Sequence, residues 1–501
     1  MKDSLSTQRA DSPVEHVRIA IIGSGFSGIG MGIRLNRAGV TDFVVLERAD
    51  ELGGTWRDNH YPGLCCDVPS HVYSYSFQLN PFWTSGFAQG WEIRAYLQHA
   101  AARYGVTPHI RYRHEVLEAA WEPGEQRWAI ETTSGRLTSD FLVNAAGPLS
   151  DPTVPDLPGL ENFEGTVFHS GQWENDHDLT GENVAVIGTG ASAIQFVPQI
   201  QSKVGKLHLF QRTPPWVIPR FDHHITGPEH FLLRWIPFAP ALVRAVLYAL
   251  LEIRVLGFRN PWLMKLADRA ARRHLASQVA DPELRAKLTP DYTMGCKRIL
   301  ISDNYYPSLV QPNVDVRVDG VREVRAHSIV TGDGSELEVD TIILGTGFHV
   351  TDIPAAKWIR GGDGRTLEEA WQGSAQAHLG TTVAGFPNLF MLLGPHTGLG
   401  HTSVLLMIES QIDYVLGALR AMDERRIGAL EPRPAVQAAF VAGLRRRARG
   451  TVWESGGCAS WYLDAGGHSV LWPDSAWRFR RALRHFDLTS YLARPYSSSS
   501  R

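Results

Sequence analysis

The sequence predicts an α/β fold with two similar units, each built on a strand, a glycine-rich turn and a helix, together with a mostly helical insertion. Apolar strands run into glycine-rich turns and then into helical spacing at residues 17–35 and again at 182–197. Residues 231–258 are strongly apolar but interrupted by prolines and charges, which predicts separate helices. With 501 residues, 44% of them hydrophobic and 20% charged, the chain can bury more than one core.

The first turn has the spacing of a dinucleotide clamp. Its glycines permit a tight turn, close approach of the backbone to a pyrophosphate, and close packing of strand on helix. The next strand, DFVVLE, ends at Glu47, 19 residues after Gly28, where a carboxylate can accept hydrogen bonds from ribose hydroxyls. The predicted contacts in this turn are Gly23, Gly25, Phe26, Ser27 and Gly28.

The second turn repeats the pattern with one change of charge. Its following strand, KLHLFQRTP, places Arg212 19 residues after Ala193, where the first motif has Glu47. A guanidinium at that position suits the additional phosphate of NADP, which a carboxylate would repel. The predicted contacts in this turn are Gly188, Thr189, Gly190, Ala191 and Ser192.

Two clamps of opposite charge predict two Rossmann-like dinucleotide-binding domains, with FAD in the first and NADPH in the second. Strand-to-glycine segments at 140–150 and 340–350 are interpreted as crossings between them. The predicted FAD domain is discontinuous and comprises residues 1–150 and 381–501. The predicted NADP domain comprises 151–219 and 291–380, with the helical insertion at 220–290.

The insertion raises the question of a membrane helix. Four charged residues interrupt 231–258, and Pro237 and Pro240 break its first half, so the run of about 18 uncharged residues that a span requires is missing. We therefore expect no membrane span. The sequence favours a buried helical segment that can contact an apolar substrate.

Bulk composition excludes several classes of function. The formal net charge of −3 predicts no basic field that would gather nucleic acid or an anionic membrane. The four cysteines, at 65, 66, 296 and 458, have neither metal-ligand spacing nor a plausible disulfide framework, which favours a reducing, cytoplasmic setting. The histidines form no HExxH or HxxxH set, so no metal is predicted. Residues 1–16 lack an apolar segment and predict no signal peptide.

Three further motifs resemble one enzyme family. The segment FEGTVFHSGQWE carries Phe163, Gly165, His169 and Trp173, and GGTWRDNHYPGLCCD carries Gly54, Trp56, Tyr61, Pro62, Gly63 and Asp67. With GCKRIL at 295–300, these motifs resemble the type I Baeyer–Villiger monooxygenases. Glu174 departs from the pattern, which usually has proline or aspartate there. We interpret 163–174 as a linker between the two domains, with Gly165 and Gly171 as a hinge, Phe163 and Trp173 as its anchors, and His169 as a coupling residue.

The resemblance implies a reaction. Reduced FAD would react with O2 to give a flavin peroxide that attacks a ketone and yields an ester or lactone, with sulfides as further substrates. Arg298 matches the active-site arginine of the family, whose permanent charge suits a reacting oxygen anion, and Asp67 matches its acidic partner. Lys297 matches a residue that assists Arg212 and Thr213 at the NADP 2′-phosphate.

Further contacts are implied by the same resemblance. Gly54, Thr55, Trp56, Asp67 and Tyr73 would lie at the flavin, the backbone of Val116 at adenine, and Trp461 on a mobile loop over the nicotinamide.

Alternatives stay open at this point. A flavin-containing monooxygenase that oxygenates sulfur or nitrogen shares both clamps, and a non-catalytic FAD-binding sensor would need only the first. A dithiol–disulfide reductase is disfavoured because Cys65 and Cys66 are adjacent. The sequence predicts neither the identity of the substrate nor the oligomeric state.

Overall fold

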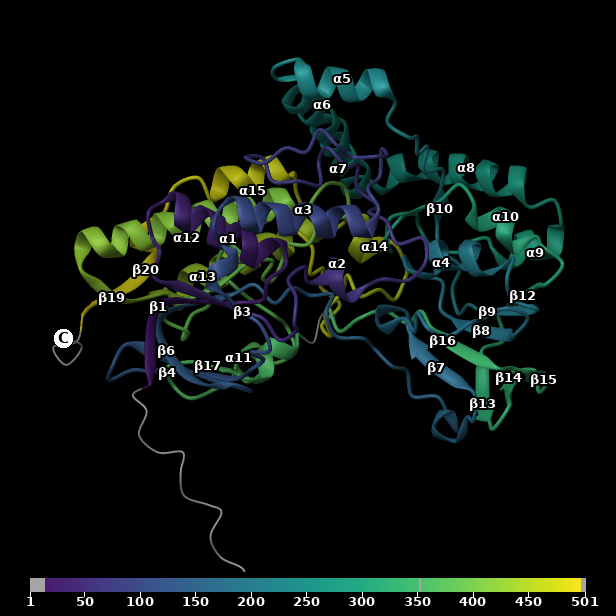
Figure 1. Ribbon diagram of the computed structural model, residues 1–501, viewed down its shortest axis with the longest axis horizontal. Helices are drawn as coiled ribbons and strands as arrows, with labels where there is room; N and C mark the ends of the chain where they lie inside the picture. The colour runs from purple at the N-terminus through teal and green to yellow at the C-terminus, as the bar shows by residue number, and fades with distance from the viewer. Residues whose placement is uncertain (1–13, 351–352, 497–501) are drawn as a thin grey trace, which may run out of the picture.

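The computed structural model describes residues 14–350 and 353–496, which form two units, each built on a β-sheet, with a group of helices standing out from them (Figure 1). The predicted N-terminal lead-in and the serine-rich tail lie, except for residues 14–16 and 496, outside the described residues.

The first sheet has eight strands in the order β17-β4-β5-β6-β1-β2-β3, with β18 also paired to β6. β1 runs parallel to β2 and β6, whereas β4, β5 and β6 form an antiparallel meander. The strands are β1 Glu15–Ile22, β2 Phe43–Leu46, β3 Ile110–Arg111, β4 Val116–Glu122, β5 Arg127–Thr132, β6 Gly135–Asn144, β17 Ile359–Arg360 and β18 Leu389–Met391.

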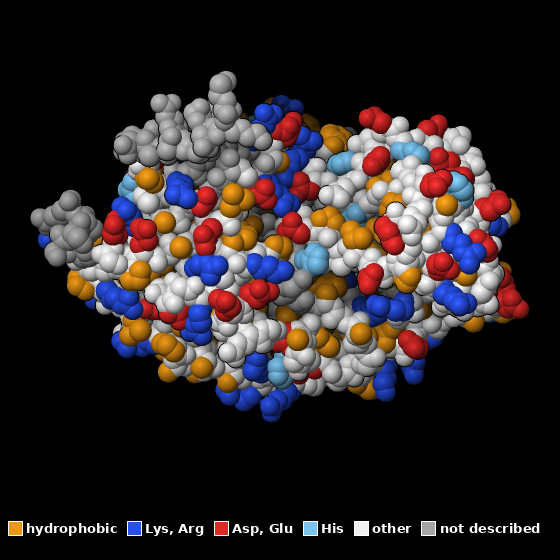
Figure 2. All heavy atoms as spheres, turned by 90° about the horizontal axis from the view of Figure 1, so that it is seen from below, with side chains coloured by type: hydrophobic (Ala, Val, Ile, Leu, Met, Phe, Trp, Pro, Cys, Tyr) orange, Lys and Arg blue, Asp and Glu red, His pale blue; other side chains and the backbone are white. Residues whose placement is uncertain are grey.

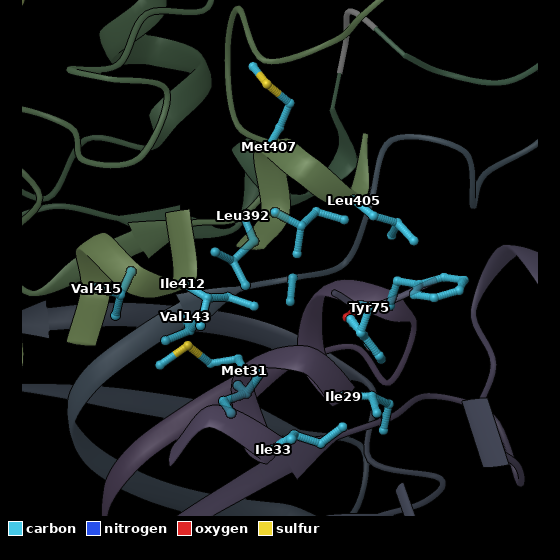
Figure 3. Close-up of a cluster of buried hydrophobic side chains, with 14 of the residues drawn as sticks. Ile29, Met31, Ile33, Tyr75, Val143, Leu392, Leu405, Met407, Ile412 and Val415 are labelled. Atoms are coloured by element: carbon cyan, nitrogen blue, oxygen red, sulfur yellow. The ribbon is translucent and has the colours of Figure 1, made fainter. Parts of the chain in front are cut away.

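Helices α1 (Phe26–Arg37), α3 (Gly90–Arg103) and α12 (Leu405–Arg425) belong to this sheet's unit. Ile29 and Ile33 recur at helical spacing on α1, and they are buried together with Ile412 of α12 and Val143 of β6 (Figure 3). Since every one of these side chains is nearly inaccessible to water, the helices are fixed to the sheet by apolar burial.

The second sheet has five parallel strands in the order β12-β9-β8-β16-β7. The strands are β7 Thr166–His169, β8 Asn183–Ile187, β9 Lys206–Phe210, β12 Val314–Arg317 and β16 Thr341–Leu344, with helix α4 at Ala193–Ile200. A small antiparallel sheet follows, formed by β13 Val321–Arg325, β14 Ser328–Thr331 and β15 Glu336–Glu338. The parallel part of the first sheet and the wholly parallel second sheet form the predicted α/β architecture.

One predicted boundary is wrong. Strand β17 pairs with β4 through Ile359 and Ala119, and helix α11 (Leu367–Trp371) buries its apolar side chains with those of the first sheet. Residues 359–371 therefore belong to the first unit. The chain returns to this unit before the predicted boundary at position 380. This return could not be recognised in the sequence, because β17 is only two residues long and too short to give a strand pattern.

Residues 227–287 form the helices of the insertion, α5 Gly227–Trp235, α6 Ala239–Ile253, α7 Val255–Arg259, α8 Pro261–Gln278 and α9 Pro282–Lys287. The chain bends by 107° between α5 and the continuous α6–α7 stretch, at the predicted break near Pro237. No single helix in the described ranges is long and apolar enough to cross a membrane. The prediction that the insertion is buried is wrong for its outer side, where large apolar side chains are exposed.

The remaining elements complete both units. They are α2 Thr55–Asp58, β10 Val217–Ile218, β11 Leu300–Ile301, α10 Tyr305–Leu309, β19 Ile427–Pro432, α13 Pro434–Ala448, α14 Val452–Ser455, α15 Ala476–Ala482 and β20 Tyr491–Pro495. On the face of the molecule opposite α5 and α6, acidic and basic side chains are interspersed (Figure 2).

Candidate active site

The first glycine-rich turn joins β1 to α1 and has no room for a side chain at Gly23 or Gly28. Gly23 has a φ of +96°, and a Cβ there would lie 2.8 Å from the carbonyl oxygen of Ala145. A Cβ on Gly28 would lie 1.9 Å from the carbonyl oxygen of Gly23. The turn therefore requires glycine, and it leaves backbone N–H groups at the start of a 12-residue helix free to receive an anion.

The GGTW segment lies directly against this turn. Gly54 has a φ of +53°, and a Cβ there would lie 3.0 Å from the Cα of Gly25. Trp56 Nε1 donates to the hydroxyl oxygen of Tyr73 at 3.1 Å, and the Tyr73 ring meets Phe26 edge-on at 5.2 Å. Two motifs that are separate in sequence thus form one glycine- and aromatic-lined surface, and Thr55 begins the short helix α2 beside it.

Glu47 is buried at the end of β2. Its Oε2 accepts from the backbone N–H of Ser24 at 3.0 Å, and its Oε1 accepts from Arg57 Nη1 at 2.8 Å. Burial would raise the pKa of Glu47, but the charge of Arg57 and the hydrogen bonds from Ser24 and Ala49 lower it below its ordinary value. The backbone N–H of His114 donates to the Glu47 carbonyl at 2.9 Å, which brings the segment leading to the buried Val116 to the same place.

The second turn repeats the geometry of the first. Gly188 has a φ of +110°, and a Cβ there would lie 2.4 Å from the carbonyl oxygen of Gly345. The next residues lead into α4, where Thr189 is buried and Gly190 and Ala191 are exposed, with Ser192 half-buried. This turn too can receive an anion through its backbone.

Arg212 lies two residues beyond the end of β9, within electrostatic range of Lys297. Burial, followed by the positive charge of Arg212, lowers the pKa of Lys297. Lys297 Nζ lies 5.1 Å from the ring centroid of Tyr292, and Thr213 follows Arg212 in a half-buried position. Within residues 14–350 and 353–496, neither cation has a carboxylate at ion-pair distance. The two side chains form a cationic site.

Asp67 and Arg298 form an ion pair although they are 231 positions apart in the chain. Asp67 Oδ2 accepts from Arg298 Nε at 2.7 Å and from Nη2 at 2.6 Å. The side chains retain 27% and 32% of their exposure, so the guanidinium is held by the carboxylate but still open to a ligand. The charge of Asp67 outweighs burial and, with hydrogen bonds to Asp67 and Tyr462, raises the pKa of Arg298 above its ordinary value.

The loop 456–471 lies next to the segment that carries Arg298. Tyr462 is buried within electrostatic range of Arg298, while Trp461 is exposed and packs edge-on against Tyr462 at 4.3 Å. A disulfide joins Cys458 of this loop to Cys296, two residues before Arg298. The prediction of no disulfide is wrong because the partners are 162 residues apart, a separation that motif spacing cannot reveal.

The FEGTVFHSGQWE segment is part of the second unit, and its interpretation as a hinge between two domains is wrong. Its strand β7 pairs with β16, and Trp173 packs on Phe168 and Phe196 of the same unit at 5.1 and 5.2 Å. Phe163 packs on that unit as well.

The glycines of this segment serve packing and not backbone freedom. A Cβ on Gly165 would lie 2.2 Å from the Asp340 carbonyl oxygen, and neither Gly165 nor Gly171 has a positive φ. His169 Nδ1 accepts from the backbone N–H of Gly171 at 3.0 Å, which fixes the ring against Phe348.

Comparisons with known proteins identify the family. The chain is 52% identical over 482 residues to a Baeyer–Villiger monooxygenase of Streptomyces coelicolor, covering 95% of this chain and 92% of the relative. It is 50% identical to a Baeyer–Villiger monooxygenase of Pseudomonas aeruginosa, covering 97% and 93%. The chain belongs to the Baeyer–Villiger monooxygenases.

Fold and broader family agree with this assignment. The crystal structure of cyclohexanone monooxygenase from Rhodococcus sp. Phi1 bound to NADP+ superimposes on this monooxygenase with a TM-score of 0.87 at 26% identity, covering 96% of this chain and all of that one. Residues 20–226 match the family described as pyridine nucleotide-disulphide oxidoreductase. The predicted family, fold class, enzymatic oxygenation and cofactors FAD and NADP are confirmed.

Both cofactors fit residues of the monooxygenase. The first turn and the buried, ionised Glu47 can hold a dinucleotide whose ribose donates hydrogen bonds, and the second turn with the unpaired Arg212 and Lys297 can hold one with an additional phosphate. In the described ranges no group of three or more metal-binding side chains is clustered.

Three residues of the site were not predicted from the sequence. Arg57 ion-pairs with Glu47, Tyr462 contacts Arg298, and Gln195 of α4 bonds the first unit by accepting from the Tyr61 hydroxyl at 3.0 Å and donating to the Cys65 carbonyl at 3.0 Å. Arg57 and Gln195 lie inside motifs already identified in the sequence, so their place in those motifs could have marked them as site residues. Tyr462 was marked only by its neighbour Trp461.

Proposed function

We propose that this monooxygenase inserts one oxygen atom of O2 next to the carbonyl of a ketone, giving an ester or lactone, and that Arg298, aimed by Asp67, stabilises the negative charge on the reacting oxygen. The observation that carries the proposal is the Asp67–Arg298 ion pair, with bonds of 2.6 and 2.7 Å between residues that are 231 positions apart in the chain. A fixed, permanently charged donor of this kind favours an anion without transferring a proton to it.

The division of work among the residues follows from this geometry. Reduced FAD, when bound, supplies the electrons that activate O2. Asp67 engages Nε and Nη2 of Arg298 through one oxygen atom, which fixes the plane of the guanidinium. Tyr462 supports Arg298 from the loop 456–471. Because the charge is in place before the substrate arrives, little reorganisation is needed as oxygen becomes negative.

We assign FAD to the first unit and NADPH to the second. Gly54, Trp56 and Tyr73 lie against the first turn and would line the flavin, while Glu47 would accept from ribose. Arg212, Thr213 and Lys297 would bind the 2′-phosphate, because the two cations have no carboxylate partner in the described part of the chain. Asp67 at the flavin, Val116 at adenine and Trp461 over the nicotinamide complete the proposal.

A ketone panel with the purified FAD-loaded enzyme tests the reaction. We expect NADPH- and O2-dependent formation of esters or lactones, and we expect Arg298→Ala to keep FAD and NADPH oxidation but lose oxygen insertion. Arg360→Ala is a matched control, since Arg360 also ion-pairs a carboxylate, Glu118, at 2.6 Å.

Two results would replace the proposal. Oxygenation of sulfides or amines without any ester would favour a flavin-containing monooxygenase reaction, and flavin that NADPH fails to reduce would favour a sensor. Ester formation that survives in Arg298→Ala would remove the arginine from the mechanism.

The cellular location stays a prediction. The cytoplasmic setting was inferred from four unpaired cysteines, and the Cys296–Cys458 disulfide removes two of them from that argument. Fractionation of the producing cells, with detection of the full chain, decides between compartments.

A further inference from the structure

The insertion carries an exposed apolar surface on its outer side. Half of the exposed large hydrophobic side chains in the described part of the chain fall within the 36 residues 231–266. We call the exposed residues of this range the outer face. Its large apolar members are Phe231, Leu232, Trp235, Ile236, Phe238, Leu242, Val246, Leu250, Ile253, Leu256, Trp262 and Leu266.

The outer face is a built feature of the helices. On α6, Leu242, Val246, Leu250 and Ile253 recur at a spacing of three or four residues and are 51–65% exposed. The opposite side of α6 is fixed to the body, because the buried Arg244 donates to the carbonyl of Ser74 at 2.9 Å. The helix therefore has a docked side and a separate apolar side, and α5 and α6 stand out from the two sheets (Figure 1).

The charges of the outer face have one sign. The exposed charged residues between 231 and 266 are Arg234, Arg254, Arg259 and Lys265. The one acidic residue of the range, Glu252, points inward and accepts from the backbone N–H of Ala476 at 3.1 Å. Arg259 is paired with Asp474, while the other three cations have no carboxylate at ion-pair distance in the described ranges. Although the bulk charge is slightly negative, this surface combines apolar and basic side chains.

The combination of exposed apolar and basic side chains indicates what kind of partner binds the outer face. Trp235 and Trp262, 61% and 68% exposed, are of the type that sits at the boundary between lipid headgroups and acyl chains, and arginine and lysine beside them attract anionic headgroups. The 107° bend between α5 and α6–α7 prevents the segment from crossing a bilayer as one helix. A second copy fits less well, because a two-fold interface would bring the same basic residues together without acidic partners.

We propose that the outer face of residues 231–266 docks this monooxygenase on an anionic lipid surface, lying in the headgroup region without spanning the bilayer. The inner side of the same insertion reaches the active-site segment. Phe258 stacks on Trp453 with ring centroids 5.4 Å apart, and its ring would lie 3.0 Å from a Cβ on Gly295, three residues before Arg298. Docking would therefore hold the active site close to the lipid. The proposal does not depend on the substrate proposed above.

Flotation of the FAD-loaded full chain with vesicles tests this docking. We expect co-flotation with vesicles of phosphatidylcholine and phosphatidylglycerol in equal parts, and much less with phosphatidylcholine alone. The double variant Leu242→Asp with Ile253→Asp should lower vesicle binding by about tenfold or more, because two apolar contacts are replaced by charges that anionic lipid repels. Both residues are exposed, so NADPH oxidation in solution should be unchanged.

Matched variants distinguish docking through the outer face from nonspecific binding to vesicles. Val154→Asp with Val318→Asp changes two equally exposed side chains outside the range and should leave binding intact. Arg234→Gln with Lys265→Gln should weaken binding to the anionic vesicles only. The proposal is overturned if the enzyme floats with neither vesicle, or if sedimentation shows a dimer that Leu242→Asp dissociates while vesicle binding is absent.

Discussion

Replacing Asp67 by asparagine should uncouple NADPH consumption from oxygen insertion. The substitution keeps the shape of the side chain and removes its charge, so Arg298 loses the partner that fixes its guanidinium. The arginine remains in place, and the side chains proposed to bind NADPH, Arg212 and Lys297, are not changed. We therefore expect flavin reduction to continue, with a smaller share of the electrons leading to ester.

The structure sets the size of the effect. Asp67 Oδ2 accepts two hydrogen bonds from Arg298, at 2.6 and 2.7 Å. Arg298 stays charged when position 67 becomes neutral, so the difference is the Coulomb attraction of the ion pair, which at about 4 Å is about 1 kcal/mol in water and about 4 kcal/mol near a protein surface. Since the side chains are 27% and 32% exposed, solvent screens the pair and the lower part of this range applies, about 1–2 kcal/mol. That corresponds to about a 5- to 30-fold loss of the oxygen-insertion rate.

Stopped-flow reduction of the flavin by NADPH, together with the ratio of ester formed to NADPH consumed, measures both steps. Glu118→Gln is the control, because it removes the charge from the Arg360 ion pair in the first sheet. If ester yield falls equally in both variants, Asp67 has no special role in aiming Arg298. If flavin reduction falls as far as ester yield, the damage lies in the fold or in cofactor binding.

Three further predictions use other parts of the site. Arg212→Ala should raise the KM for NADPH by about tenfold or more and change that for NADH little, because only NADPH has the 2′-phosphate; equal changes in steady-state assays with both coenzymes would contradict this role. The folded-state pKa of Glu47 is lowered, so its stabilising contribution is complete above the ordinary glutamate pKa and is lost as the pH falls through the lowered value. Denaturation of wild type and Glu47→Gln should differ at neutral pH and converge in acid, and a constant difference would refute the linkage. Cys458→Ser should reduce stability by about 2–4 kcal/mol and make the loop 456–471 sensitive to protease, as reduction of the wild type should; a variant with wild-type melting and digestion would show that the crosslink does not restrain the loop.

Local motifs made part of the site predictable. Each clamp is a strand, a turn and a helix within a short stretch, and Gly23 and Gly188 must be glycine because their positive φ and close backbone contacts exclude a side chain. The charges that end the neighbouring strands, Glu47 and Arg212, follow from the same repeat. Such features depend on residues that are close in sequence, so they can be predicted from the sequence alone.

Contacts between distant segments could not be predicted from motif spacing, and only the Asp67–Arg298 contact followed from the family resemblance. The spacing of Asp67 and Arg298 in the sequence does not predict their contact, and no motif predicts the Cys296–Cys458 disulfide. Gly165 shows a different difficulty, since the sequence reveals a required glycine but not whether conformation or packing requires it. The outward apolar side of α6 was hidden because helical spacing does not say which side meets the protein.

The Asp67–Arg298 contact also limits how this enzyme can be rebuilt. Asp67 follows helix α2 and Arg298 lies just before strand β11, 231 positions later, so neither segment alone contains the ion pair. An exchange of residues 151–380 with those of a relative would import an arginine whose carboxylate partner, Asp67, stays behind in the host, as do Tyr61 and Cys65, the partners of Gln195. The units are consequently not interchangeable modules, and chimeras of this chain should be cut so that both sides of that junction travel together.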